Sequence, residues 1–290
     1  MHPVIEQLLA SGPIITDGAW GTQLQSLGLE PGECPDAWNT LNPERVESVA
    51  RAYVDAGSRV ILSNTFRSNR IALAGYGLAG SAAELSRAGA AISVRAAGQR
   101  ALVFASIGPS GKMILTGETT EDELGAAFEE QAAALAAGGA HGLVVETMSD
   151  LAEALIAVRA AKTTGLPVVA SMVFDSGKNK DRTMMGQTPE QCAEALAEAG
   201  ADAVGANCGR GIAGYLPICS RMAAASPLPI WIKPNAGLPE ITGGTLSYRD
   251  TPEQFASYAP ALIEAGAKFI GGCCGSTPDF IRALIAKVAA

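Results

Sequence analysis

The chain alternates short apolar segments with longer stretches of helical periodicity. Apolar runs rich in Val and Ile occur at 13–16, 59–64, 102–107, 142–146, 167–174, 202–207, 229–234 and 268–272. Short continuous apolar runs of this kind are typical of strands buried on both faces of a parallel sheet. The stretches between them have the spacing of helices, which we expect at about 43–56, 81–98, 121–138, 149–163, 189–199, 213–224, 252–265 and 278–288.

Local signals support these helix positions and lead to a fold. Thr188, Thr251 and Thr277 each offer an N-cap followed by proline at the first helical position. Several helices end in a small-residue turn with glycine, as in EAGADA and EAGAKF. Repeated βα units without an intervening linker predict an α/β fold, a single (β/α)8 TIM barrel domain over 1–290 with an N-terminal helix across the bottom. A doubly wound open sheet is the alternative.

Composition and charge narrow the classes of partner. The 290 residues are 48% hydrophobic and carry a formal net charge of −8, so a polyanion such as a nucleic acid is not an expected partner. No apolar run reaches the roughly 18 residues of a membrane span, and the start, MHPVIEQLLASGP, lacks the features of a secretory signal. We therefore expect a cytoplasmic protein without a membrane partner.

Barrel enzymes place their sites at the carboxyl ends of the strands, which makes the residues after each run the candidates. The two histidines, His2 and His141, do not follow a strand, so we expect no histidine general base, and a transition-metal site would be built from sulfur or carboxylate. The candidates are Asp17, Gly18, Trp20, Asn64, Thr65, Phe66, Gly108, Pro109, Glu146, Thr147, Asp175, Asn207, Cys208, Lys233, Asn235, Cys273 and Cys274.

Three of the six cysteines follow strands that open onto the same face. Cys208 ends the sixth predicted strand, and Cys273 and Cys274 end the eighth, so the three thiols can converge. Buried packing thiols, a strained vicinal disulfide and a zinc site are the three alternatives. Three thiolates with one open position suit zinc that binds a thiol substrate, because zinc lowers the pKa of that thiol while the electron-rich complex leaves its sulfur nucleophilic. The other cysteines are expected to serve packing: Cys34, Cys192 and Cys219.

Six motifs together carry a family resemblance. DGAWGTQLQ, NTF, VVETM, GANCG, KPNAGLP and GGCCGSTP resemble the homocysteine S-methyltransferases, zinc-dependent barrel enzymes that move a methyl group onto homocysteine to make methionine. The likeness runs from about residue 12 to the C-terminus.

The resemblance also implies roles for particular residues. It implies that Zn²⁺ is held by Cys208, Cys273 and Cys274, with Asn235 able to cap the metal before substrate arrives. It further implies that the amino acid end of homocysteine is held by four residues at the ends of the first and fourth strands: Asp17, Gly18, Glu146 and Thr147.

The methyl donor is less constrained by the sequence. The betaine-using animal enzymes have Tyr where this chain has Thr147, whereas LGLEPGECPDAWN and RTMMGQTP look like bacterial short-form betaine–homocysteine methyltransferases. The 290 residues leave no room for a cobalamin or folate domain, so we expect a small donor, betaine being favoured. A sulfonium such as S-methylmethionine, or a separate methylated corrinoid protein, is the alternative. Aromatic faces would attract a cationic donor, with Trp38 as the first candidate beside Trp20 and Phe66.

Other functions remain open from the residues alone. Lys233, in IWIKPN, follows the seventh strand and would serve an aldolase-like barrel as a Schiff-base lysine. GSTP after the eighth strand opens a helix whose N-terminus could accept a phosphate. A zinc carrier or thiol sensor without catalytic activity is the non-enzymatic alternative.

Overall fold

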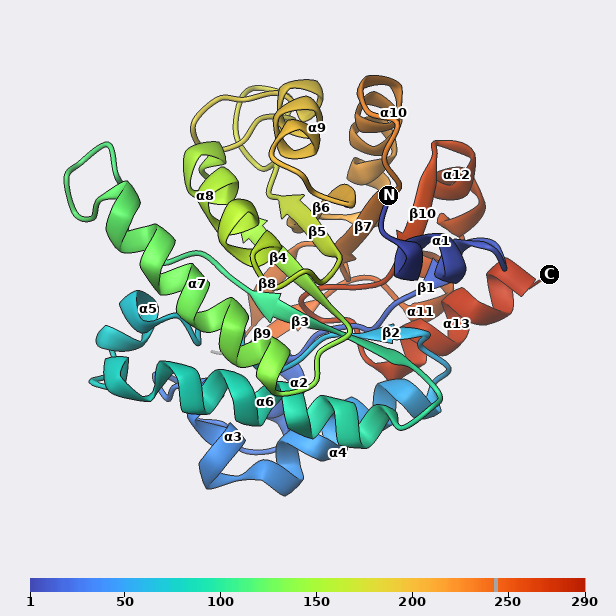
Figure 1. Cartoon of the computed structure of the whole chain (residues 1–290). Helices are drawn as coiled ribbons and strands as arrows, with labels where there is room; N and C mark the ends of the chain where they lie inside the picture. The colour runs from blue at the N-terminus through green and yellow to red at the C-terminus, as the bar shows by residue number, and fades with distance from the viewer. Residues whose placement is uncertain (243–244, 290) are drawn as a thin grey trace.

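The eight apolar runs form eight parallel strands that close into a barrel (Figure 1). The structure is a computed structural model that describes residues 1–242 and 245–289. Strand neighbours follow the chain order, and a parallel bridge between Thr16 and Val60 joins the first strand to the second. The barrel strands are β1 (Ile14–Ile15), β2 (Val60–Ile61), β3 (Leu102–Ile107), β4 (Gly142–Met148), β5 (Val168–Met172), β6 (Ala203–Gly211), β7 (Ile230–Asn235) and β10 (Ala267–Ile270). The predicted (β/α)8 barrel is therefore confirmed, and the open sheet is excluded.

The helices around the barrel lie within a few residues of their predicted positions. They are α4 (Pro43–Asp55), α6 (Ala82–Ala97), α7 (Glu121–Ala137), α8 (Leu151–Lys162), α9 (Pro189–Glu198), α10 (Tyr215–Ala225), α11 (Pro252–Ala256), α12 (Ala259–Glu264) and α13 (Pro278–Ala289). Thr188 and Thr251 form capping boxes with Gln191 and Gln254, as their Thr-Pro pairs suggest. The helix expected at 252–265 is divided in two, because Pro260 near the start of α12 has no N–H to continue the ladder.

Short elements in the long loops at the carboxyl end of the barrel were not predicted. They are α2 (Gly21–Ser26), α3 (Trp38–Leu41), α5 (Arg70–Ala74), the 3₁₀ turns Pro35–Ala37, Ala79–Ser81 and Ile212–Gly214, and the antiparallel hairpin β8 (Pro239–Thr242) and β9 (Thr245–Tyr248). These elements are too short to show a clear hydrophobic period. They surround the end of the barrel at which all the candidate residues lie.

An apolar cluster fills the opposite end of the barrel. The helix α1 (Pro3–Leu9) contributes Ile5 and Leu8 to this cluster, which also contains side chains from all eight strands, so the expected N-terminal helix does cover the bottom. Trp231 is fully buried, with its ring centroid 6.5 Å from that of Phe104 in a stacked arrangement and 5.2 Å from that of Phe269. Because large side chains occupy the lower interior, polar groups are confined to the upper end.

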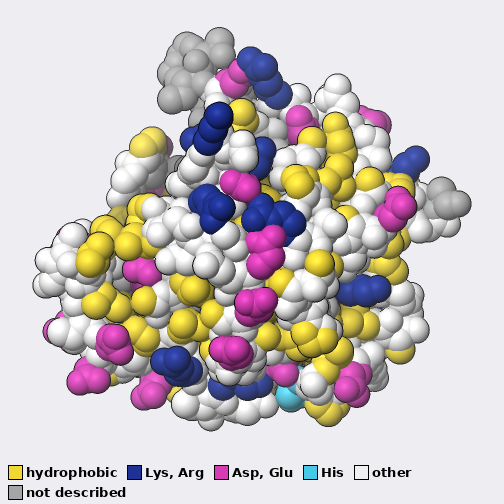
Figure 2. All heavy atoms as spheres, turned by 90° about the horizontal axis from the view of Figure 1, so that it is seen from above, with side chains coloured by type: hydrophobic (Ala, Val, Ile, Leu, Met, Phe, Trp, Pro, Cys, Tyr) yellow, Lys and Arg dark blue, Asp and Glu magenta, His cyan; other side chains and the backbone are white. Residues whose placement is uncertain are grey.

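Charges of both signs are mixed on the surface. Figure 2 shows Lys and Arg side chains interspersed with Asp and Glu side chains on one face, with hydrophobic side chains between them. Arg221 on α10 pairs with Asp181 and Glu190 at 2.6 Å each, and its hydrogen bonds lower the pKa of Glu190 to about 2. Within the described ranges, none of the helices combines the length and the apolar character needed to cross a bilayer.

We expect Trp231→Ala to destabilise the protein by about 3–5 kcal/mol, because it leaves a cavity between two aromatic rings in the lower barrel. The urea unfolding midpoint and slope measure this change. Trp231→Phe keeps an aromatic ring and removes an indole N–H that has no partner among the described groups, so it should cost less than about 1.5 kcal/mol. Equal losses for the two variants would contradict this account of the core.

Candidate metal and thiol site

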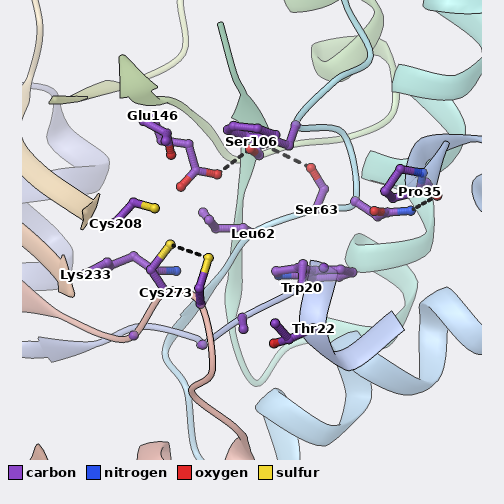
Figure 3. A pocket seen from close by; sticks show the side chains of 18 of the residues that line it. Trp20, Thr22, Pro35, Leu62, Ser63, Ser106, Glu146, Cys208, Lys233 and Cys273 are labelled. Carbon is purple, nitrogen blue, oxygen red and sulfur yellow. Dashed lines mark hydrogen bonds between the residues drawn. The ribbon is translucent and has the colours of Figure 1, made fainter. Parts of the chain in front are cut away.

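A cavity of about 370 Å³ opens at the carboxyl end of the barrel (Figure 3). Its deep part combines sulfur, carboxylate and ammonium groups, whereas aromatic and exposed polar side chains line its outer part. The lining residues are Gly18, Ala19, Trp20, Gly21, Thr22, Gln25, Pro35, Asp36, Leu62, Ser63, Asn64, Phe66, Arg67, Ser106, Glu146, Thr147, Cys208, Lys233, Tyr248, Gly272, Cys273 and Cys274.

The three candidate thiols converge on this cavity. The Sγ atoms of Cys208, Cys273 and Cys274 all lie within 4.8 Å of one another, and those of Cys273 and Cys274 are 4.0 Å apart. All six cysteines are free thiols, so the vicinal disulfide is not formed. Each thiol of the trio is partly exposed, which distinguishes it from a packing cysteine.

The backbone conformation and its hydrogen bonds fix the positions of these three cysteines. Cys208 has φ +62°, a left-handed conformation that is uncommon outside glycine, and its carbonyl accepts a 2.6 Å hydrogen bond from the Tyr215 hydroxyl. The loop after β10 is fixed to the end of β7, because the Cys273 N–H donates to the Pro234 carbonyl at 2.7 Å and the Ala236 N–H donates to the Cys274 carbonyl at 3.0 Å.

Steric crowding explains why glycines flank the Cys273–Cys274 pair. A Cβ on Gly272 would overlap the Ser276 hydroxyl, and Gly275 has φ +81° with the Tyr248 ring against its Cα. Ser276 is fully buried, and its hydroxyl donates to the Cys273 carbonyl at 2.6 Å. The GSTP segment therefore holds the loop in place, and its one buried hydroxyl is already used within the chain.

The pKa values of the three thiols are shifted in different directions. Hydrogen bonds from Cys273 and Cys274 hold the pKa of Cys208 well below its usual range, whereas the hydrogen bond with Cys208 and then burial raise the pKa of Cys273. The pKa of Cys274 is also raised, chiefly by its hydrogen bond with Cys208. Three thiolates close together repel one another, so a cation bound between them would favour ionisation of all three.

The dimensions of the trio suit a metal with thiolate ligands. A tetrahedral zinc with Zn–S bonds of about 2.3 Å places its sulfurs about 3.8 Å apart, close to the separations found here. Asn235, which is 4% exposed, hydrogen bonds to Cys208, while its Oδ1 is buried without a partner among the described groups. An unsatisfied amide oxygen beside three soft sulfur donors fits a bound cation better than it fits an empty thiol cluster.

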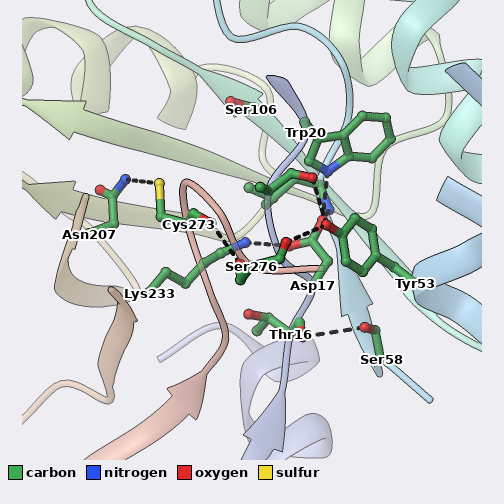
Figure 4. Close-up of polar contacts among 12 residues, drawn as sticks. Thr16, Asp17, Trp20, Tyr53, Ser58, Ser106, Asn207, Lys233, Cys273 and Ser276 are labelled. Atoms are coloured by element: carbon green, nitrogen blue, oxygen red, sulfur yellow. Dashed lines mark hydrogen bonds and ion pairs between the residues drawn. The ribbon is translucent and has the colours of Figure 1, made fainter. Parts of the chain in front are cut away.

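Asn207 connects the sulfur site to the neighbouring strands. The Asn207 side chain is fully buried. Its Oδ1 accepts hydrogen bonds from the Thr147 N–H at 2.9 Å and from the Ser171 hydroxyl at 2.7 Å. Its Nδ2 donates to Thr147 Oγ1 at 2.7 Å. Nδ2 also lies 3.9 Å from the Cys273 sulfur (Figure 4). Thr147 has φ +60°, so Asn207 stabilises an unusual turn directly after Glu146.

Glu146 is a buried carboxylate in the cavity wall, on the strand next to that of Ser106. It is 7% exposed, and its Oε1 accepts a 2.5 Å hydrogen bond from the Ser106 hydroxyl. Burial raises the pKa of Glu146, while the charge of Lys233 and the Ser106 hydrogen bond oppose this increase. A buried carboxylate without a cation of its own is suited to binding a cationic group.

Asp17, which the resemblance places beside the acceptor, is not among the side chains that line the cavity. Its Oδ2 accepts from the Trp20 indole N–H at 2.8 Å and from the Leu62 N–H at 2.7 Å, and its Oδ1 pairs with Lys233 (Figure 4). Asp17 is fully buried and does not line the cavity, whereas the adjacent Gly18 does. The Asp17 carboxylate therefore joins the ends of β1, β2 and β7.

Lys233 is placed unfavourably for Schiff-base chemistry. A Schiff-base lysine must be free to attack a carbonyl carbon, whereas the Lys233 ammonium is held in an ion pair with the buried Asp17 carboxylate. The side chain is 2% exposed and lines the cavity.

Two of the three candidate aromatic side chains reach the cavity. Trp20 and Phe66 line it, but Trp38 is 4% exposed, packs in the core and lies under the Arg45 guanidinium, 5.2 Å from the ring centroid. The loop after β1 folds into a 3₁₀ turn and α3, which directs this indole inward.

Tyr248 and Asp36 are among the lining residues that were not found from the sequence. Tyr248 comes from the hairpin, and burial together with the nearby Cys274 raises its pKa. Asp36 lies in the 3₁₀ turn, accepts from the Ser68 hydroxyl at 2.6 Å, and has a pKa raised by burial to about 6. Both follow segments without a strand signal, so the rule that identified the other candidates could not reach them.

The remaining cysteines and His141 lie outside the site. Cys34, Cys192 and Cys219 are buried, and burial raises the pKa of each thiol, as expected of packing residues. His141 accepts a 3.0 Å hydrogen bond from the Val103 N–H before β4 and does not line the cavity.

Comparison with known proteins identifies the family. Residues 14–288 match the model of the homocysteine S-methyltransferases. The chain belongs to this family. The methionine synthases of Mycobacterium leprae and Mycobacterium tuberculosis are 30% and 31% identical to it, over 98% and 97% of its length. The chain spans about a quarter of the length of these two curated relatives, 25% of each.

A solved structure with the same fold is similar over the full length. It is the metallated form of the homocysteine methyltransferase MmuM from Escherichia coli. The two structures superpose with a TM-score of 0.82 and 23% identity, over 99% of this chain and 100% of MmuM. At this identity the likeness shows the common barrel. The family resemblance carried by the sequence motifs is confirmed by the family match.

We expect Asn207→Ala to lower the free energy of unfolding by about 1–3 kcal/mol, because it leaves the buried Thr147 N–H and Ser171 hydroxyl without their partner. Urea unfolding of the metal-free protein measures the change. Ser257→Ala is the control, since it removes an exposed hydrogen bond to the Gln254 carbonyl and should cost no more than about 0.5 kcal/mol. A loss as small for Asn207→Ala would contradict its role in holding the turn.

Proposed function

We propose that the protein methylates the thiol of homocysteine to give methionine, using a zinc ion and a small cationic methyl donor. The observation that carries this proposal is the convergence of three partly exposed thiols, within 4.8 Å of one another, on a cavity that also holds a buried carboxylate. Membership of the homocysteine S-methyltransferase family supports the choice of homocysteine as the acceptor.

Cys208, Cys273 and Cys274 are the proposed zinc ligands, and Asn235 is the proposed ligand in the absence of substrate. The donor set favours a soft cation, and the orphaned Asn235 Oδ1 supports a fourth ligand from the chain. Bound zinc would offer an open position for the acceptor sulfur and lower the pKa of that thiol at neutral pH. The metallated form of MmuM, a protein with the same fold, is consistent with this choice.

Glu146 is the proposed partner of the acceptor ammonium group. Its carboxylate is buried, faces the cavity and is oriented by the Ser106 hydroxyl. Gly18 and Thr147 line the same cavity and would form part of the wall against the amino acid. The protein would thus fix the acceptor at both ends, which reduces the entropic cost of aligning the thiol with a methyl group.

The outer part of the cavity is the proposed donor site. Trp20, Phe66 and Tyr248 present aromatic rings there, and rings of this kind attract a quaternary ammonium or sulfonium group. Betaine is the favoured donor, because LGLEPGECPDAWN and RTMMGQTP resemble segments of the bacterial betaine enzymes. The thiolate sulfur would attack the methyl carbon, a neutral amine would leave, and no general base would be needed. A sulfonium donor would use the same rings. A methylated corrinoid protein is the third candidate donor, because the curated relatives are methionine synthases.

Methionine formation by the reduced, zinc-loaded protein tests the function. Homocysteine is supplied with betaine, S-methylmethionine or methylcobalamin in parallel, and the metal content of each sample is measured. Turnover with one donor identifies it. Absence of methionine with all three donors, in samples that contain one zinc per chain, would contradict the proposal.

We expect Cys274→Ala to lose both zinc and methionine formation, because two thiolates and an amide leave the cation without its third charged ligand. Metal content after gel filtration and turnover with homocysteine are the measurements. Cys192→Ala is the matched control, since this thiol is buried on α9 away from the cavity, and it should retain zinc. Full zinc occupancy in Cys274→Ala would refute the ligand assignment.

We expect Phe66→Leu to raise the KM for a cationic donor by about 3- to 30-fold, because it removes one aromatic face worth about 0.5–2 kcal/mol to a desolvated cation. Steady-state kinetics at saturating homocysteine measure this effect. Trp38→Phe is the control, because Trp38 lies in the core, and it should leave the donor KM within about twofold. The reverse order of effects would place the donor at Trp38.

A further inference from the structure

Lys233 is a buried cation in the wall of the acceptor cavity. Its side chain is 2% exposed, lines the same cavity as Glu146 and the three thiols, and points into it from the end of β7 (Figure 3). An ammonium group has three donors. Among the described residues Lys233 hydrogen bonds to Asp17 and lies over the Trp231 ring, 5.9 Å from its centroid, which satisfies one face of the ammonium and one donor. Buried polar groups are ordinarily satisfied, so the remaining donors of Lys233 require an explanation.

The Asp17 carboxylate balances the charge of Lys233. Asp17 gives one oxygen to Lys233, and its other oxygen is saturated by the Trp20 indole and the Leu62 N–H. The Asp17 carboxylate is therefore fully partnered, whereas Lys233 keeps donors that face the cavity. Glu146 is near enough to Lys233 for the ammonium to lower its pKa, yet no ion pair joins the two among the described residues. Besides Asp36 and the exposed Arg67, the cavity thus presents a buried ammonium and a separate buried carboxylate, those of Lys233 and Glu146.

We infer that Lys233 binds the α-carboxylate of the acceptor thiol, while Glu146 binds its ammonium group. A zwitterionic amino acid complements a wall that offers an ammonium and a carboxylate side by side, and each buried charge gains a partner when it binds. Lys233 then selects acceptors that carry a carboxylate. This inference rests on the proposed function, since it concerns recognition of the same acceptor.

The ion pair with Asp17 has a defined part in this recognition. It holds the Lys233 ammonium in place at the wall of the cavity. Asp17 is accordingly a positioning residue that acts through Lys233. This also accounts for a fully buried aspartate that does not reach the cavity.

Binding of three thiols to the zinc-loaded protein, measured by calorimetry without a methyl donor, tests the inference. Homocysteine carries both charged groups, 3-mercaptopropylamine lacks the carboxylate, and 4-mercaptobutanoate lacks the ammonium. We expect Lys233→Met to weaken binding of homocysteine and 4-mercaptobutanoate by about 10- to 100-fold, the effect of one hydrogen bond to a charged group. Binding of 3-mercaptopropylamine should not weaken. Glu146→Gln should show the opposite selectivity between the two analogues.

Two further variants separate recognition from structure. Lys233→Met with Asp17→Asn removes the stranded buried carboxylate, so it guards against misfolding and should keep the same loss of selectivity. Asp17→Asn alone keeps the ammonium and should retain the preference for carboxylates. Equal weakening of all three thiols in both Lys233 variants would overturn the inference. Selective thiol binding without methyl transfer from any donor would instead refute the proposed function and leave the carboxylate site standing.

Discussion

The site depends on a single seam, where the end of β1 meets the loop that follows β10. The Gly272 N–H donates to the Asp17 carbonyl at 3.0 Å, the Ala19 N–H donates to the Ser276 carbonyl at 3.0 Å, and the Tyr53 hydroxyl donates to the carbonyls of both Ala19 and Ser276. These bonds exist only because the barrel closes, with β1 pairing β10 and bridging β2. Closure therefore sets the position of Cys273 and Cys274 relative to everything carried by the other strands.

Closure also explains why this loop is rich in glycine. A Cβ on Gly271 would overlap the Thr16 hydroxyl, and one on Gly18 would lie 2.8 Å from the Ser276 carbonyl. The two loops approach so closely that side chains are excluded along the seam. The adjacent cysteines are then the first side chains that can extend from it, and the carbonyls and N–H groups on either side hold them at the end of β7.

The sequence was sufficient for the barrel and for the sulfur site, but not for the direction of each side chain. Strand positions follow from apolar runs, and the carboxyl ends of β6 and β10 must lie on either side of β7, so convergence of Cys208 with the Cys273–Cys274 pair was predictable. The orientation of Asp17 was not, because it depends on Lys233 and Trp20, whose approach is fixed only by the closed barrel. Trp38 and Tyr248 lie on short loop elements without a periodic pattern, so their burial could not be derived locally.

The arrangement of charge in the cavity follows from its depth. Glu146 and Lys233 are 7% and 2% exposed, so each is held in a setting where an unpaired charge is costly, while Arg67 at the mouth is exposed to solvent. Polar groups deep in a barrel persist where they are partnered by the chain or by a ligand. Among the described residues, Asp17 is fully partnered, whereas Glu146 hydrogen bonds to Ser106 and Lys233 contacts Asp17 and the Trp231 ring, which leaves donors and acceptors of both groups for a ligand. The part of the wall with incomplete partners is therefore the part shaped for a charged ligand, and it adjoins the sulfur atoms at which the chemistry would take place.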